Sequence, residues 1–171
     1  MKFTDYDKAI MIGLLLGDGH VDYKGRIEIT HCEKQREYLE YKAKLLHSVT
    51  GGKDINIHTI HKISVFKKGD KIISQKEITN YCLKRQSKDF IQFRNLLYLN
   101  NRKSITKEIL DLMYPITIAL WWMDDGCLTA KYTYPKGNRV KCGYTLRLCT
   151  YVSKEENELI RQYFLDKYSM K

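Results

Sequence analysis

Two stretches of similar design decide the fold: Met11-Ile12-Gly13-Leu14-Leu15-Leu16-Gly17-Asp18-Gly19 and Ile118-Ala119-Leu120-Trp121-Trp122-Met123-Asp124-Asp125-Gly126. Each is apolar on almost every side, which predicts a helix that is buried on most of its faces. Each ends in Asp-Gly, and the final glycines are 107 residues apart. A single Asp-Gly is a common turn dipeptide. Its recurrence after two apolar helices predicts an internal duplication.

The first of these helices is expected to run from about Asp5 to Asp18, with Thr4 or Asp5 as its N-cap. Gly13 lies in its middle, where glycine costs roughly 1 kcal/mol relative to alanine. A close neighbouring helix would justify that cost. Gly19 is expected in the left-handed conformation that often ends a helix.

Alternating and helical patterns follow the first helix. We predict a half-buried strand over 21–31, an amphipathic helix over 33–49, a hairpin of strands 55–66 and 71–83, a helix capped by Ser87 and a short helix after Ser104. On the strand over 21–31, Val21, Tyr23, Ile27 and Ile29 are expected to face the core.

The pattern then starts again. Pro115 suits the first turn of the second apolar helix. A second hairpin is expected over 128–134 and 139–150, and Ser153 and Glu156 form a capping box that opens another helix. We therefore divide the chain into a first repeat over residues 1–113 and a partial second repeat over 114–171.

The net charge of the chain indicates which kinds of partner to expect. Lys and Arg total 30 against 20 Asp and Glu, which gives a net charge of +10. This charge favours a polyanionic partner, nucleic acid first and an acidic membrane surface second. The apolar runs are too short to cross a bilayer, and no secretory signal is evident, so no membrane partner is expected.

Cysteine usage bears on the compartment. The five cysteines form no CxxC pair, which predicts free thiols in a reducing, intracellular setting: a bacterial or phage cytoplasm, or an organelle matrix. The protein is not expected to be secreted. A zinc site formed by Cys127, Cys142 and Cys149 is a weak alternative, because their spacing matches no common ligand pattern.

The two stretches resemble the two motifs of LAGLIDADG homing endonucleases, and the nearest likeness is to single-chain members encoded in group I introns. Asn101-Arg102-Lys103-Ser104-Ile105 and Tyr114-Pro115 add to the resemblance. It implies an α+β fold of two pseudo-symmetric αββαββα repeats, whose antiparallel, saddle-shaped sheets bind DNA in the major groove. It also implies that the two motif helices pack side by side, with Gly13 and Ala119 small enough for close approach.

The resemblance also implies a catalytic centre. Asp18 and Asp125, which end the motif helices, would be catalytic carboxylates and ligands of Mg²⁺, with Mn²⁺ as a substitute. Gly17 and Asp124 precede them and are further metal-site candidates, Asp124 the weaker because it aligns with the small residue of the motif.

Three peripheral residues are catalytic candidates by position. Lys103 would polarise water or offset phosphate charge. His31 would orient a water or protonate a leaving group. Tyr151 would take the place of His31 in the second repeat, although relatives often carry Gln at these positions.

The predicted strands supply basic DNA-binding candidates. Lys24, Arg26 and Glu28 are expected on one strand face, where Arg can read guanine and Glu can accept from cytosine. The other candidates are hairpin-tip or strand residues, of which the tip lysines are expected on phosphates: Lys67, Lys68, Lys84, Arg85, Lys136, Arg139, Lys141 and Arg147. Arg139, Lys141 and Arg147 share odd spacing and are expected to line one face.

These residues favour a site-specific endonuclease that hydrolyses double-stranded DNA at a long target with a divalent metal. An intron maturase of the same fold, with intron RNA as partner, is the first alternative. A DNA-binding regulator without catalysis is the second, but both motif aspartates are present. A basic helical domain without catalysis is the third, and it leaves the duplication unexplained.

The second repeat is short. Only 45 residues follow Gly126, enough for one hairpin and one helix. We expect its sheet to be two strands short and its apolar face partly uncovered. A fragment, a truncated variant or a chain completed by a second chain would each fit. The chain alone is expected to bind mainly the half-site read by the first repeat and to cut poorly or on one strand.

Overall fold

The computed structural model describes residues 2–170, apart from the side chains of residues 67 and 68. The first repeat contains α1 (Asp5–Leu16), β1 (His20–Val21), β2 (Arg26–Cys32), α2 (Arg36–Thr50), β3 (Ile57–Lys68), β4 (Lys71–Gln86), α3 (Ile91–Leu97), β5 (Tyr98–Leu99), β6 (Arg102–Lys103) and α4 (Lys107–Asp111). The second contains α5 (Pro115–Asp125), β7 (Gly126–Thr133), β8 (Val140–Leu148) and α6 (Lys154–Tyr168). The predicted α+β class is confirmed, and all sheet pairs are antiparallel.

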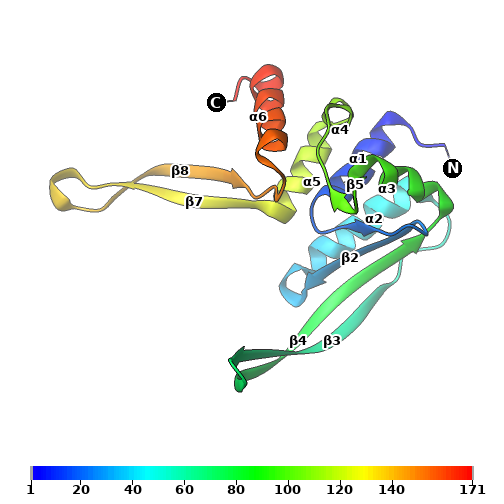
Figure 1. Cartoon of the computed structure of the whole chain (residues 1–171), viewed down its shortest axis with the longest axis horizontal. Coiled ribbons are helices and arrows are strands. Elements are labelled where there is room, and N and C mark those ends of the chain that lie inside the picture. Colours follow the sequence, from blue (N-terminus) through cyan, green and yellow to red (C-terminus); the bar gives the residue numbers. More distant parts are fainter. Residues whose placement is uncertain (1, 171) are drawn as a thin grey trace.

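The two motif helices α1 and α5 pack against each other at the centre of the molecule (Figure 1). Gly13 allows this contact, because a Cβ there would lie 3.0 Å from both Leu120 Cδ1 and Thr117 Cα. The Thr117 hydroxyl also donates to the Ala9 carbonyl at 2.8 Å. The expectation for Ala119 is wrong, since Ala119 is exposed and the buried Thr117 takes the position opposite Gly13.

The start and end of α1 have different determinants. Thr4 caps the helix in a capping box with Asp7, as the sequence indicates. Gly19 does not adopt a positive φ, so that expectation is wrong. Glycine is required there for space instead, because a Cβ would lie 2.0 Å from the Leu14 carbonyl oxygen.

The first sheet has the order β1-β2-β4-β3, with its helix-facing side in the core. The single strand expected over 21–31 is wrong, because a tight turn separates β1 from β2. Asp22 Oδ1 accepts from the backbone N–H groups of Lys24 and Arg26, and Gly25 adopts φ +69°. Tyr23 therefore lies in the turn and is 74% exposed, not inward.

The second repeat is smaller and less buried. Its sheet has two strands, β7 and β8, whereas the main sheet of the first repeat has four. The motif helix α5 buries only Thr117, Leu120 and Trp121 among its described residues, so the expectation of a helix buried on most faces is wrong here. In Figure 1 the β3–β4 and β7–β8 hairpins extend as two arms from the central helices. Within residues 2–170, no helix has both the length and the apolarity needed to span a membrane.

Candidate active site

The ends of the two motif helices meet at one cavity. Asp18 and Asp125 both line a hollow of about 310 Å³, together with Lys103, Gly17 and Trp121. These residues are separated by up to about a hundred positions in the sequence. The pairing of α1 with α5 brings them together, as expected for a duplicated motif.

Asp125 is the more enclosed of the two cavity carboxylates. Trp121 Nε1 donates to its Oδ2 at 3.2 Å, one helical turn away. Burial raises the pKa of Asp125, and the nearby carboxylates of Asp18 and Asp124 raise it further. A cluster of like charges of this kind is stabilised by a cation.

Lys103 supplies a positive charge at the same cavity. Its Nζ donates to the Gly17 carbonyl at 2.5 Å and to the Leu16 carbonyl at 3.4 Å, both at the end of α1. Burial lowers the pKa of Lys103, while Asp125 and Asp18 act in the opposite direction. The Gly17 carbonyl, one of the candidate metal ligands, therefore already accepts a hydrogen bond from Lys103.

The segment that carries Lys103 is anchored by Glu156 of α6. The Glu156 carboxylate accepts from the Ser104 hydroxyl at 2.6 Å, the Ile105 backbone N–H at 2.8 Å and Arg102 at 2.7 Å. Although burial opposes ionisation, hydrogen bonds from the Ser104 hydroxyl and from the backbone N–H groups of Ser153 and Ile105 bring the pKa of Glu156 down to about 2. Sequence analysis assigned Glu156 only a capping role, and no local signal reveals this contact between repeats.

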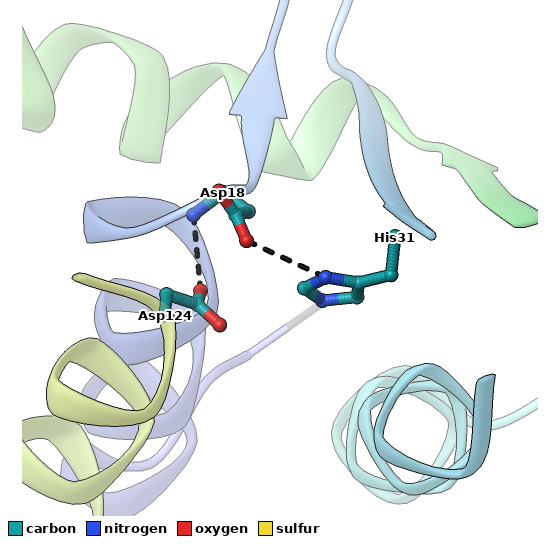
Figure 2. A group of neighbouring side chains, drawn as sticks. All are labelled: Asp18, His31 and Asp124. Atoms are coloured by element: carbon teal, nitrogen blue, oxygen red, sulfur yellow. Dashed lines mark hydrogen bonds and ion pairs between the residues drawn. The ribbon is translucent and has the colours of Figure 1, made fainter. Parts of the chain in front are cut away.

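A second group lies behind Asp18 (Figure 2). His31 Nδ1 is 3.4 Å from Asp18 Oδ2, and Asp124 Oδ2 accepts from the Asp18 backbone N–H at 3.0 Å. Lys42 Nζ contacts both Asp124 oxygens, at 2.5 and 2.7 Å, and lies 2.9 Å from His31 Nε2. Nothing in the sequence singles out Lys42, which lies within the amphipathic pattern of α2.

The His31 side chain is 1% exposed. Burial lowers its pKa first, followed by the charge of Lys42. A buried imidazole between Asp18 and Lys42 is poorly placed to protonate a leaving group. Its position suits contact with Asp18 instead.

The donors available to a metal divide into two sets. Asp18, His31 and Asp124 offer ligand atoms within 4.8 Å of one another, but Lys42 already contacts both oxygens of Asp124. Asp18, by contrast, is 43% exposed, and it shares the open cavity with Asp125. Two carboxylates at such a cavity fit the oxygen preference of Mg²⁺.

The counterpart of His31 in the second repeat is Thr150, not Tyr151. His20 follows the first motif glycine and Cys127 follows the second, so these two residues correspond. His20 pairs with Glu28 on β2, and Cys127 pairs with Arg147 on β8, so Glu28 and Arg147 correspond as well. Three residues after Glu28 is His31, and three residues after Arg147 is Thr150. Tyr151 is 86% exposed and has φ +51°.

The uncovered face of the first sheet carries two of the predicted DNA-binding residues on β2. Arg26 and Glu28 alternate with the buried Ile27 and Ile29. Glu28 lies opposite Lys84 on β4 and forms an ion pair with it at 3.2 Å. This face can present alternating polar groups to a groove.

Two neighbouring predictions need correction. Arg85 lies opposite the buried Ile27, on the helix-covered side, and its guanidinium donates to the Gly51 and Lys53 carbonyls. It therefore fixes the loop after α2. Lys24 is exposed but belongs to the turn before β2, so it does not share the strand face with Arg26.

The same register reveals basic residues that sequence analysis missed. Lys62 on β3 and Lys76 on β4 lie at positions in phase with the Lys84 face, and both are exposed. The two-residue alternation along the predicted hairpin would have been enough to place Lys62 and Lys76 on this face. The side chains of Lys67 and Lys68, predicted at its tip, lie outside the described residues.

The second arm exposes Lys136, Arg139, Lys141 and Arg147. Arg139 stacks on Tyr132 at 3.8 Å from the ring centroid, and Lys141 contacts Tyr144. A register shift between Lys131 and Tyr132 interrupts the strand alternation. Odd spacing therefore does not place these residues on one face, and that expectation is wrong.

The zinc alternative receives no support among the described residues. Cys127, Cys142 and Cys149 are free and exposed, and within residues 2–170 the group of possible ligands that lie close together is Asp18, His31 and Asp124.

Curated proteins that resemble this chain include RecA proteins of mycobacteria. Protein RecA of Mycolicibacterium flavescens is 25% identical over 137 residues, covering 76% of this chain and 28% of that protein. Protein RecA of Mycobacterium gastri is 20% identical over 176 residues, covering 98% and 38%. The chain thus spans well under half the length of these curated relatives.

The fold has a match among solved structures. The homing endonuclease I-WcaI bound to its DNA recognition sequence aligns with a TM-score of 0.68 at 18% identity, over 99% of this chain and 70% of that one. A model of the LAGLIDADG DNA endonuclease family matches residues 8–171, which include most of α1, all of α5 and the cavity between their ends. The chain belongs to the LAGLIDADG DNA endonuclease family.

Proposed function

We propose that this chain is a site-specific DNA endonuclease that hydrolyses phosphodiester bonds of double-stranded DNA with a divalent metal, Mg²⁺ or Mn²⁺. The observation that carries the proposal is the shared cavity of Asp18, Asp125 and Lys103 at the ends of two paired motif helices. The family supports DNA cleavage as the activity. The metal is supported by the carboxylate chemistry of the cavity.

The residues have separate roles in this proposal. Asp18 and Asp125 would hold the ion, which lowers the pKa of attacking water and stabilises a leaving oxygen when bound. Lys103 keeps positive charge beside the two carboxylates and would offset charge on the phosphate. Trp121, through its bond to Asp125, holds that carboxylate in position.

DNA would lie against the uncovered side of the first sheet and the β7–β8 arm. Lys62, Lys76, Lys136 and Lys141 would contact phosphates, which position the protein without reading sequence. Arg26 would read a base edge in the major groove. The target being DNA, we expect the protein to act inside the cell, where its host sequence lies.

The second sheet suggests a further partner. β8 corresponds to β2, whose other edge pairs with β4, whereas no described strand pairs with that edge of β8. Beside it, Trp122, Leu146, Leu148, Phe164 and Met170 line an apolar hollow of about 480 Å³. We infer that two further strands, supplied by another polypeptide segment or a second chain, would complete this half. Without them, the chain should favour the half-site read by the first repeat.

The test is cleavage of a plasmid that carries the joined sequence flanking the gene's insertion point. Linear or nicked product is expected with Mg²⁺ and none with EDTA. Assisted splicing of a host intron RNA, without any cleavage of that plasmid, would favour the maturase alternative. Binding to the target with no cleavage by any metal would favour a DNA-binding regulator.

A further inference from the structure

Lys42 is a charged side chain buried inside the protein. It is 0% exposed, as is the Asp124 side chain with which it forms an ion pair. Its Nζ also lies 4.4 Å from the centroid of the Tyr38 ring. A buried lysine is rare unless its charge is compensated, and none of the roles assigned above uses it.

The hydrogen-bond inventory of Lys42 determines the tautomer of His31. An ammonium group has three donors and no acceptor. It donates to both oxygens of Asp124, and His31 Nε2 lies 2.9 Å away. Since Lys42 only donates, Nε2 must accept. The imidazole proton is then on Nδ1, which faces Asp18 Oδ2 at 3.4 Å.

Asp124 also contacts Asp18 directly, through the Asp18 backbone N–H. It reaches this position because the residue before Asp18 is glycine: a Cβ on Gly17 would lie 2.2 Å from Asp124 Oδ2. Lys42 thus acts on the Asp18 side chain through His31, and Asp124 holds the Asp18 backbone N–H directly.

This arrangement is not repeated at Asp125 within residues 2–170. Gly17 occupies the motif position that matches Asp124 and has no carboxylate. Thr150, which has no imidazole and lies just after β8, is the residue that matches His31 by counting from the paired strands. The two motif carboxylates therefore have chemically different supports.

We propose that Lys42, held by Asp124, is a positioning residue that fixes the His31 tautomer and orients Asp18, so that the two halves of the catalytic centre respond unequally to its loss. The cleavage part of this proposal rests on the proposed function. Its tautomer part concerns the free protein and can be tested without any cleavage.

The first test measures cleavage of each strand separately on end-labelled target DNA. The strand assigned to Asp18 is the one that Asp18→Asn slows more. Lys42→Met should slow that strand by about 10- to 100-fold more than the other, the usual cost of removing a group that orients a ligand. Lys44→Met, an exposed lysine on the same helix, is the matched control and should leave the ratio of strand rates unchanged.

Lys42→Met leaves Asp124 as an uncompensated buried charge, so the double variant Lys42→Met/Asp124→Asn provides a folded comparison. It should show the same strand bias. Equal slowing of both strands in both variants would mean a structural role only and would overturn the proposal.

The second test uses long-range ¹⁵N–¹H NMR correlations of the histidine rings in the free protein. His31 should be the Nδ1–H tautomer in the full chain and in Lys44→Met, and should lose that preference in the double variant. An Nε2–H tautomer for His31 in the unsubstituted protein would contradict the proposal even if the enzyme cuts DNA. A protein with the expected tautomer but no cleavage would instead point to failure of the proposed function.

Discussion

The ends of the two motif helices show how a duplication diverges. Both present an aspartate to the same cavity, but Asp18 is preceded by glycine and Asp125 by a second carboxylate. The extra carboxylate, Asp124, turns toward the first repeat and forms an ion pair with Lys42. The two motifs thus share the position of the proposed metal-binding carboxylate and differ in the residues that support it.

The sharpest test of this comparison removes each cavity carboxylate in turn. We expect Asp18→Asn and Asp125→Asn each to reduce cleavage by more than about 100-fold, because even groups that only orient metal ligands cost 10- to 100-fold. Binding of the target should remain close to that of the unsubstituted protein in a gel-shift titration. Normal cleavage by either variant would rule out the shared cavity as the catalytic centre.

The helix pair offers a second contrast, between Gly13 and Ala119. Gly13→Ala should destabilise the protein by about 1–3 kcal/mol, the usual cost of overpacking, because the new methyl would press on Leu120 and Thr117. Ala119→Ser, at an exposed position, should change stability by no more than about 0.5 kcal/mol. Urea unfolding measures both, and equal effects would mean that the helices do not approach closely at Gly13.

The contribution of Glu156 to the free energy of unfolding should decrease at low pH. Its folded pKa of about 2 lies below the ordinary 4.5, so its stabilisation is complete above about pH 4.5 and is lost as the pH falls toward 2. Glu156→Gln should lower stability at neutral pH by roughly 1–3 kcal/mol, since it leaves buried donors poorly paired.

The same substitution should flatten the fall in stability below pH 4.5. Glu158→Gln is the matched control, because Glu158 lies on the exposed face of α6 with Arg161. Thermal melts between pH 2.5 and 7 provide the comparison. An unchanged acid profile in Glu156→Gln would show that α6 does not hold the Lys103 segment through this carboxylate.

The smallest expected effects concern the two kinds of DNA contact. Lys62→Ala and Lys76→Ala should weaken binding to all sequences alike, and each should reduce the slope of log K against log salt by roughly one. Arg26→Ala should instead relax preference at one base position, at a cost of about 1–3 kcal/mol for the preferred base. Arg85→Ala should change neither slope nor preference, because its guanidinium is used within the protein.

The sequence was sufficient for the parts of the fold that rest on local pattern. The motif helices, the two long hairpins and the Ser153 capping box follow from periodicity, turn residues and caps, and all are present. The prediction of a single strand over 21–31 was wrong because the residues of the tight turn also alternate between apolar and polar. Alternation alone therefore cannot distinguish this turn from a continuous strand. The role of Asp22 in that turn is visible only in its hydrogen bonds.

Some residues of the candidate site could likewise be predicted from the sequence, and others could not. Asp18 and Asp125 could be named because each ends an apolar motif, and Lys103 because its segment resembles the corresponding segment of the family. Lys42 and the anchoring role of Glu156 could not, since each acts on a segment from the other repeat. Ala119 was misassigned because a small residue is no evidence of contact until the rotation of its helix is known.

We expect the metal to be held by Asp18 and Asp125, not by the neighbouring group of Asp18, His31 and Asp124. Anomalous diffraction from crystals of the protein–DNA complex grown with Mn²⁺ tests this directly. We expect an anomalous peak in the cavity beside Asp18 and Asp125, with Lys42 still paired to Asp124. A peak bound by His31 and Asp124, with Lys42 displaced, would contradict it.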